Sequence, residues 1–392
     1  MSSKLLVFIL QMFFTVYFTH SVFAEEEIKK MQKNDPLTEL EDIAKDIIQS
    51  YDWVLKSLPA VGLIEKSHLK RLDVENYLHR QKKYNLQINI ANDLSINLSG
   101  IDLSGLDFSN AILSNVILVG ANLTNTLFSE AIIENCDMRN VIGISAKFDR
   151  ANIDNTVFDG ANLQYVDFRD TFANDVSFIK VNLANAIITN ASFQEGNFSY
   201  STFNDAILQN SQFQKSIFQN TIARNTLFVG ASLEYVKANN SDWTNADMNN
   251  VQASNANFSN SDLSNVNMFC GKFSKVNFQN AKMVNIYGEG IDFSDANFTY
   301  ANISGSILNS TSFRRAIIQN ADMSRCAMND IDIHQADMSN TILDYSVMKD
   351  VLLVSTNVNN ISIKEVFLQA NKIYDVDLSK AKIQNSVIQT KE

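Results

Sequence analysis

The stretch SNANFSNSDLSNVNM, residues Ser254 to Met268, carries one large apolar side chain in every five residues. These are Phe258, Leu263 and Met268, while Asn and Ser fill most of the remaining positions. A spacing of five matches neither the 3.6-residue period of an α-helix nor the two-residue period of a β-strand. The stretch therefore indicates a backbone in which each group of five residues is one structural unit.

The same spacing continues through about three quarters of the chain without an insertion or a deletion. Every fifth residue from Leu98 to Ile388 gives 59 positions, and all but six of them are large and apolar. The six exceptions are Gly143, Ala173, Ala223, Ala238, Ala253 and Gly288. A run of this length predicts one continuous repeat array rather than several separate domains.

The residue two places before each large position is also restricted. It is mostly small, as at Ala111, Ala121 and Ala246. Two side chains separated by one residue point to the same side of an extended backbone, so we expect both to face inward and the residue between them to face outward. The other two residues are rich in Asn, Ser, Asp, Gly and Gln, which suit a corner because they tolerate left-handed backbone conformations.

The five-residue segments AILSN, ANLTN, ANIDN, ANLQY, ANFSN, ANISG and ADMSN resemble the pentapeptide repeat family. The resemblance implies an all-β solenoid, a right-handed quadrilateral β-helix with four pentapeptides in each coil. The 59 repeats would then form about 15 coils, and at ~4.8 Å per coil the solenoid would be a rod of about 70 Å.

Residues 1–24 are typical of a signal peptide, with a basic Lys4, an apolar run from Leu5 to Phe18, and a cleavage site between Ala24 and Glu25. The apolar run is shorter than the ~20 residues that a membrane-spanning helix needs. We therefore expect cleavage, no stable membrane insertion afterwards, and an extracytoplasmic protein that is periplasmic or secreted. Residues 25–36 are predicted to be a linker.

Residues 37–95 are predicted to be a helical N-terminal segment or cap, in front of a repeat array at 96–392. Apolar residues at helical spacing predict one helix over 37–58 and a second over about 67–84. In the second helix we expect Leu69, Leu72, Tyr77 and Leu78 to face inward. Such helices could cover the first coil or bind a partner. Because no such segment follows the last repeat, a homodimer through the C-terminal end is also expected.

The sequence predicts a protein that is not an enzyme, with no cofactor and no metal site. His68, His79 and His334 are not spaced as metal ligands, and the many Asp residues occupy the outward position where the repeat prefers Asn or Asp. Cys136 and Cys326 fall at inward positions and Cys270 outside, so we expect no disulfide.

Outward residues twenty positions apart are predicted to stack on one face of the solenoid. One such column holds a predicted interaction stripe: Ile187, Ile207, Leu227, Tyr287, Ile307, Val347, Phe367 and Val387. A shorter column on another face contains Ile112, Ile132 and Phe172. Aligned apolar side chains can mark a contact surface or can simply strengthen the β-ladder, and the sequence leaves both explanations open.

Three functions are compatible with these features. The first is a non-catalytic extracytoplasmic scaffold or interaction rod with an unidentified protein partner. The second is a DNA-mimicking, topoisomerase-binding protein, and the third is an exported effector that acts on another cell. The repeat array carries 30 acidic and 20 basic side chains, whereas duplex DNA carries about 40 negative charges over ~70 Å. The weak mimicry and the predicted signal peptide favour the first function, and the net charge of −11 disfavours nucleic-acid binding.

Overall fold

The computed structural model describes residues 69–93 and 96–390. The chain divides into two units, Met1–Glu65 and Lys66–Glu392, and all the described residues belong to the second unit. The predicted signal peptide, its cleavage site at Ala24 and Glu25, the linker, the helix at 37–58 and His68 lie outside the described residues.

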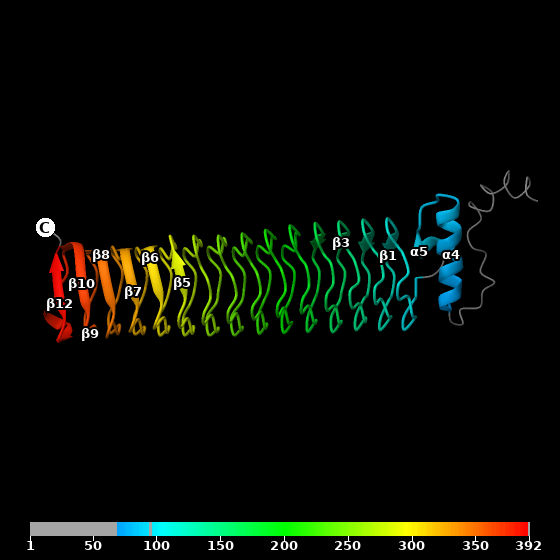
Figure 1. Cartoon of the computed structure of the whole chain (residues 1–392). Helices are drawn as coiled ribbons and strands as arrows, with labels where there is room; N and C mark the ends of the chain where they lie inside the picture. Colours follow the sequence, from blue (N-terminus) through cyan, green and yellow to red (C-terminus); the bar gives the residue numbers. More distant parts are fainter. Residues whose placement is uncertain (1–68, 94–95, 391–392) are drawn as a thin grey trace, which may run out of the picture. The chain divides into compact units, whose positions relative to one another are not determined.

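The repeat array forms a parallel β-solenoid of about 14 turns, which confirms the predicted fold (Figure 1). Outward residues pair with those twenty positions later, as Ile187 does with Ile207 and Ile207 with Leu227. Each coil therefore contains four sides of five residues. Because every coil hydrogen-bonds to the next, the backbone polar groups are satisfied along the axis of the solenoid.

The secondary structure begins with the helices α4 (Arg71–Lys83) and α5 (Ile90–Asp93). The strands are β1 (Ile112–Ser114), β2 (Ile132–Glu134), β3 (Asn152–Asp154), β4 (Phe172–Asn174), β5 (Tyr287–Glu289), β6 (Ile307–Ser312), β7 (Ala327–Asp332), β8 (Val347–Val354), β9 (Ser362–Lys364), β10 (Phe367–Tyr374), β11 (Lys382–Gln384) and β12 (Val387–Thr390). A 3₁₀-helix, η1, spans Leu378–Lys380. The sheets have the strand orders β1-β2-β3-β4, β12-β10-β8-β7-β6-β5 and β11-β9.

The corners have the left-handed conformation that the Asn-rich positions predict. At one corner Asn110 has a φ of 60°, and the Ala111 amide donates to the Phe108 carbonyl at 3.0 Å. A positive φ at the third residue of such a four-residue turn defines type II geometry, which favours Gly or Asn there. The corner chemistry thus turns the chain after every three extended residues.

The large inward residues stack on one another along the axis. The rings of Phe108 and Phe128 lie 5.3 Å apart, and those of Phe128 and Phe148 lie 4.8 Å apart. These side chains are buried in a single hydrophobic core that extends from Val74 in α4 to Leu368 in β10. Offset ring stacking adds to the free energy gained by burying the rings.

The small inward positions are often Ser or Thr, and their buried hydroxyls have partners in the coil below. Ser241 Oγ donates to the Phe218 carbonyl at 2.5 Å and accepts from the Thr221 amide at 3.2 Å. Burying a hydroxyl without such partners would be costly. The hydroxyls therefore continue the backbone hydrogen-bond network into the core.

Helix α4 packs on the first coil, but its inward face differs from the prediction. Leu72 is 62% exposed, whereas Val74, Tyr77, Leu78 and Gln81 are buried. The prediction was wrong at Leu72 because the buried residues of α4 follow one another at intervals of three or four positions. Leu72 lies one position away from that series and so points to another side of the helix. Leu69 precedes the helix and packs partly against the core.

Candidate interaction surface

The predicted stripe forms one ladder on one face of the solenoid. Isolated bridges pair Ile187, Ile207 and Leu227 in sequence, and continue through Asp247 and Asn267 to Tyr287. From Tyr287 onward, strands β5, β6, β7, β8, β10 and β12 bring together Tyr287, Ile307, Ala327, Val347, Phe367 and Val387. We call these six residues the contact stripe.

The two apolar parts of this ladder differ in exposure. In the contact stripe Tyr287 is 50%, Ile307 45%, Val347 43% and Val387 51% exposed, and Phe367 is half-buried. In the earlier part, Ile187, Ile207 and Leu227 are all half-buried. The contact stripe is therefore the more accessible apolar surface.

Polar residues at the outward position have a structural task. The amide of Ser104 donates to Asp102 Oδ1 at 3.0 Å, and the amide of Ser324 donates to Asp322 Oδ1 at 2.9 Å. Each carboxylate thereby caps the corner that follows it, as Asx-turns do. This task explains the many Asp residues without any catalytic role.

Apolar residues in the contact stripe cannot make this bond. In six successive coils, the outward residue therefore forms no side-chain hydrogen bond to the following corner and exposes an apolar side chain instead. Positions that break a local structural rule are expected at functional sites. The contact stripe is for this reason the strongest candidate for a functional surface on the described part of the chain.

Charged residues border the contact stripe at the corners of the central coils. Arg325 and Asp344 lie on one border, with Arg325 exposed and Asp344 half-buried. Asp330 and Lys349 are exposed on the other border. An apolar centre with a polar rim is the usual composition of a protein–protein contact surface. The sequence-based prediction missed these border residues because an isolated charge at a corner carries no pattern.

A second apolar column lies on the face formed by β1 to β4. Ile132 is 39% and Phe172 64% exposed, but Asn152 stands between them in the ladder. Ile112 is half-buried. This column is shorter and interrupted, so it makes a weaker candidate than the contact stripe.

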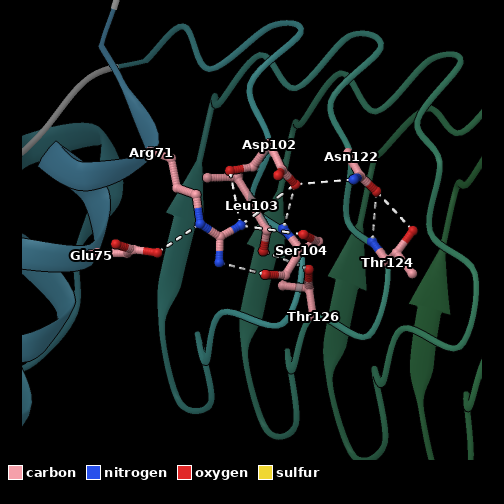
Figure 2. A network of polar contacts seen from close by, with 8 residues as sticks. All are labelled: Arg71, Glu75, Asp102, Leu103, Ser104, Asn122, Thr124 and Thr126. Atoms are coloured by element: carbon pink, nitrogen blue, oxygen red, sulfur yellow. Dashed lines mark hydrogen bonds and ion pairs between the residues drawn. The ribbon is translucent and has the colours of Figure 1, made fainter.

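The junction between α4 and the first coil depends on Arg71 (Figure 2). Its guanidinium donates to the Asp102 carbonyl at 3.4 Å, to Ser104 Oγ at 3.2 Å and to the Ser104 carbonyl at 2.8 Å. In the next coil the equivalent carbonyls, those of Asn122 and Thr124, accept from the amides of Leu103 and Gly105. Arg71 thus replaces the coil that would otherwise lie below the first one.

Two carboxylates at this junction are held in their charged form. Hydrogen bonds from the Ser104 side chain and amide lower the pKa of Asp102, with a smaller effect of Arg71. Partial burial raises the pKa of Asp107, but hydrogen bonds from Lys82 and Ser109 outweigh it and leave a net lowering. Lys82 also forms an ion pair with Asp107. The junction is accordingly a charged contact.

The remaining His, Cys and carboxylate residues form no metal-binding cluster in the described ranges. Between residues 69 and 390, apart from 94 and 95, no group of three His, Cys, Asp or Glu residues could hold a metal ion. Burial raises the pKa of the Cys136 thiol to about 11 and that of Cys326 to about 12. Cys270 is half-buried, and all three cysteines are free. Of the helices described, none is long and apolar enough to cross a membrane.

Comparison with known proteins agrees with this geometry. The model of the family described as pentapeptide repeats matches this chain in eight copies. The matches fall within residues 95–129, 121–160, 157–199, 226–265, 272–309, 291–330 and 306–344. The chain belongs to the pentapeptide repeat family. Among curated proteins no match was found.

Solved structures of other pentapeptide repeat proteins are similar to this one. HetL from a Nostoc cyanobacterium, involved in heterocyst differentiation regulation, is 16% identical over 70% of this chain and 98% of its own, with a TM-score of 0.25. QnrB1, a plasmid-mediated fluoroquinolone resistance protein, is 12% identical over 55% of this chain and 90% of its own, with a TM-score of 0.25. A protein of the Arabidopsis thaliana thylakoid lumen is 23% identical over 24% of this chain and 66% of its own, with a TM-score of 0.17.

Proposed function

We propose that this pentapeptide repeat protein is a non-catalytic, extracytoplasmic interaction rod that binds another protein through the contact stripe. The observation that carries the proposal is the exposed apolar ladder from Tyr287 to Val387 on a continuous six-stranded sheet. The charged border and the loss of the corner caps support the same conclusion. The solenoid presents this surface as a rigid scaffold.

A purely structural role for the contact stripe is the competing explanation. Apolar cross-strand pairs stabilise a sheet by about 0.2–1 kcal/mol each. That gain is available to any of the four faces, yet an unbroken run of six aromatic or aliphatic side chains occupies this face alone in the described coils. An exposed apolar ladder bordered by charges is better explained by a partner.

The extracytoplasmic location rests on the sequence of residues 1–24. Fractionation of the producing cell, with mass spectrometry of the N-terminus of the recovered chain, tests it. We expect a chain that begins near Glu25 in the periplasm or the medium. A cytoplasmic chain that retains Met1 would contradict the location, and inhibition of a type II topoisomerase would then be the function to assay.

The C-terminal end is a further surface in this proposal. Ile383, at an inward position of the last turn, is 46% exposed. A homodimer through the C-terminal end therefore remains a prediction, which would be excluded if Ile383→Asp left the association state unchanged.

A further inference from the structure

We infer that the partner of the contact stripe is a second copy of this chain, bound face to face and antiparallel. This inference rests on the proposed function, because it assigns the occupant of the same surface. In this arrangement a two-fold axis lies between Ala327 and Val347 and runs along the strands. The last turn of each copy then lies against the coil that contains Tyr287 of the other.

The contact stripe has the shape that sheet-on-sheet packing needs. Its strands pair in parallel at twenty-residue intervals, and the stripe residues stay in register from Tyr287 to Val387. Sheets pack face to face at about 10 Å when apolar side chains from the two inner faces interdigitate. An uninterrupted ladder can meet its own copy without a step at any coil.

The sizes of the side chains select the antiparallel orientation. About the proposed axis Ala327 faces Val347, Ile307 faces Phe367 and Tyr287 faces Val387, so each pair joins a smaller and a larger side chain. In the parallel orientation Phe367 would face Phe367 and Ala327 would face Ala327. That orientation would crowd one coil and leave a void at another, and both defects are costly in a packed interface.

The borders bring opposite charges together in the dimer, with one pair of like charges. Arg325 of one copy comes opposite Asp344 of the other, and Asp330 comes opposite Lys349 and Asp350. Because the interface is isologous, each of these contacts occurs twice. None of Arg325, Asp330 and Lys349 takes part in an ion pair within the described chain. Opposite charges on both borders suit a second copy of this same face, and the side-chain sizes rather than the charges select the orientation.

The expected interface is small. Six coils at ~4.8 Å and a side roughly 15 Å wide correspond to about 400 Å² on each copy. The total of about 800 Å² lies at the low end of specific interfaces, where association is weak or transient. We therefore expect a dimer that forms at micromolar concentrations rather than a permanent one.

Sedimentation equilibrium of the full mature chain measures this association. The variant Val347→Lys places two charges in the interface, and we expect its dissociation constant to rise more than about tenfold. The matched control is Ile342→Lys, because Ile342 is 40% exposed and faces outward on a different side of the same coil. We expect less than a twofold change for Ile342→Lys. Equal effects of the two variants, or a monomer at all concentrations, would overturn the dimer.

Cross-linking with a short bis-maleimide determines the orientation. In a Cys270→Ser background, we expect a mixture of Tyr287→Cys and Val387→Cys chains to form cross-linked dimers. Neither chain should do so alone, because the two copies of either residue lie five coils, about 24 Å, apart in the antiparallel dimer. Self-cross-linking of the Tyr287→Cys chain would show the parallel orientation, and cross-linking of Ile342→Cys would show non-specific contact. Either result would overturn the proposal. A monomer whose contact stripe still cross-links to other proteins in the cell would refute the dimer but leave the interaction rod standing.

Discussion

At the scale of single residues, Trp243 shows how a core can absorb departures from the repeat. The positions at which the large residue is replaced by Ala include Ala223, directly below Trp243 in its ladder, and Ala238 and Ala253 on other sides of the same coil. Trp243 is fully buried and its ring centroid lies 4.7 Å from that of Phe228. The indole therefore fills space that three small side chains leave free.

Two glycines at large inward positions are compensated in the same way. An added Cβ at Gly143 would lie 2.7 Å from Leu163 Cδ2, and one at Gly288 would lie 2.5 Å from Ile291 Cδ1. A neighbouring side chain thus occupies the place of the missing one. At these exceptions to the five-residue pattern, a neighbouring side chain in the same or the next coil fills the volume of the missing one.

We predict that Trp243→Ala lowers the free energy of unfolding by about 3–5 kcal/mol, because it leaves a cavity among residues that are already small. The control Trp243→Phe should cost less than about 1.5 kcal/mol, since the ring is largely retained and the indole N–H has no hydrogen-bond partner in the described residues. Chemical denaturation measures both. Similar losses for the two variants would show that the indole does not fill this space.

At the scale of elements, the junction of α4 with the first coil combines apolar packing and charge. Lys82 and Arg71 contact Asp107 and Asp102, which belong to neighbouring sides of that coil. These ion pairs are partly exposed, so their individual contributions are small. The hydrogen bonds of Arg71 to two backbone carbonyls add specificity because they close the edge of the solenoid.

We predict that Arg71→Ala combined with Lys82→Ala weakens the docking of α4 by about 1–2 kcal/mol. The amides of α4 should exchange faster with solvent, while those of the central coils keep their protection. Arg80→Ala combined with Lys83→Ala is the control, because these exposed residues belong to the same helix. Faster exchange in the control variant as well would mean that helix charge, rather than the junction, holds α4 in place.

The same junction should depend on pH in a defined direction. The pKa values of Asp102 and Asp107 lie below their ordinary value of 3.8 in the folded chain. Their contribution to stability is therefore fully present above that value and is lost as the pH falls through the lowered pKa values. Protection of the α4 amides should fall below roughly pH 4, and less steeply in the Arg71→Ala and Lys82→Ala variant. An unchanged slope would place the acid sensitivity elsewhere.

The five-residue period was sufficient to predict the coil, the corner and the inward residues. Both the burial of side chains and the backbone conformation recur every five residues, in step with the sequence pattern. It predicted that Cys136 and Cys326 are buried, and that residues twenty positions apart stack. It could not predict Arg71 as the residue that closes the edge, since several basic residues share α4. The inward set of α4 was partly wrong at Leu72 for a related reason, because a short helix carries little periodic information.

At the scale of the whole molecule, the residues that stabilise the solenoid are different from those that are available for binding. The inward residues hold the coils together, and the outward residues are free to vary as long as the corners turn. The contact stripe could be recognised in the sequence because its residues recur every twenty positions. Its border charges and its partner could not, since neither is encoded in a repeat.

We predict that Ile307→Asp combined with Phe367→Asp abolishes association through the contact stripe without unfolding the rod. Both positions face outward, and Asp is common at the outward position elsewhere, as at Asp322 and Asp332. Circular dichroism should therefore retain the thermal transition, while association is lost. Unfolding of the double variant would instead favour a structural role for the stripe.

Site-specific photo-cross-linking in the producing cell tests the contact stripe most directly. A photoreactive phenylalanine derivative replaces Ile307 in one strain and Ile342 in another, and the cross-linked products are compared by mass. The interaction rod predicts abundant adducts of defined mass at Ile307 and few at Ile342, with an adduct of twice the chain mass for the dimer. Equal labelling at both positions, or no protein adduct at Ile307, would contradict the assignment of the contact stripe as a binding surface.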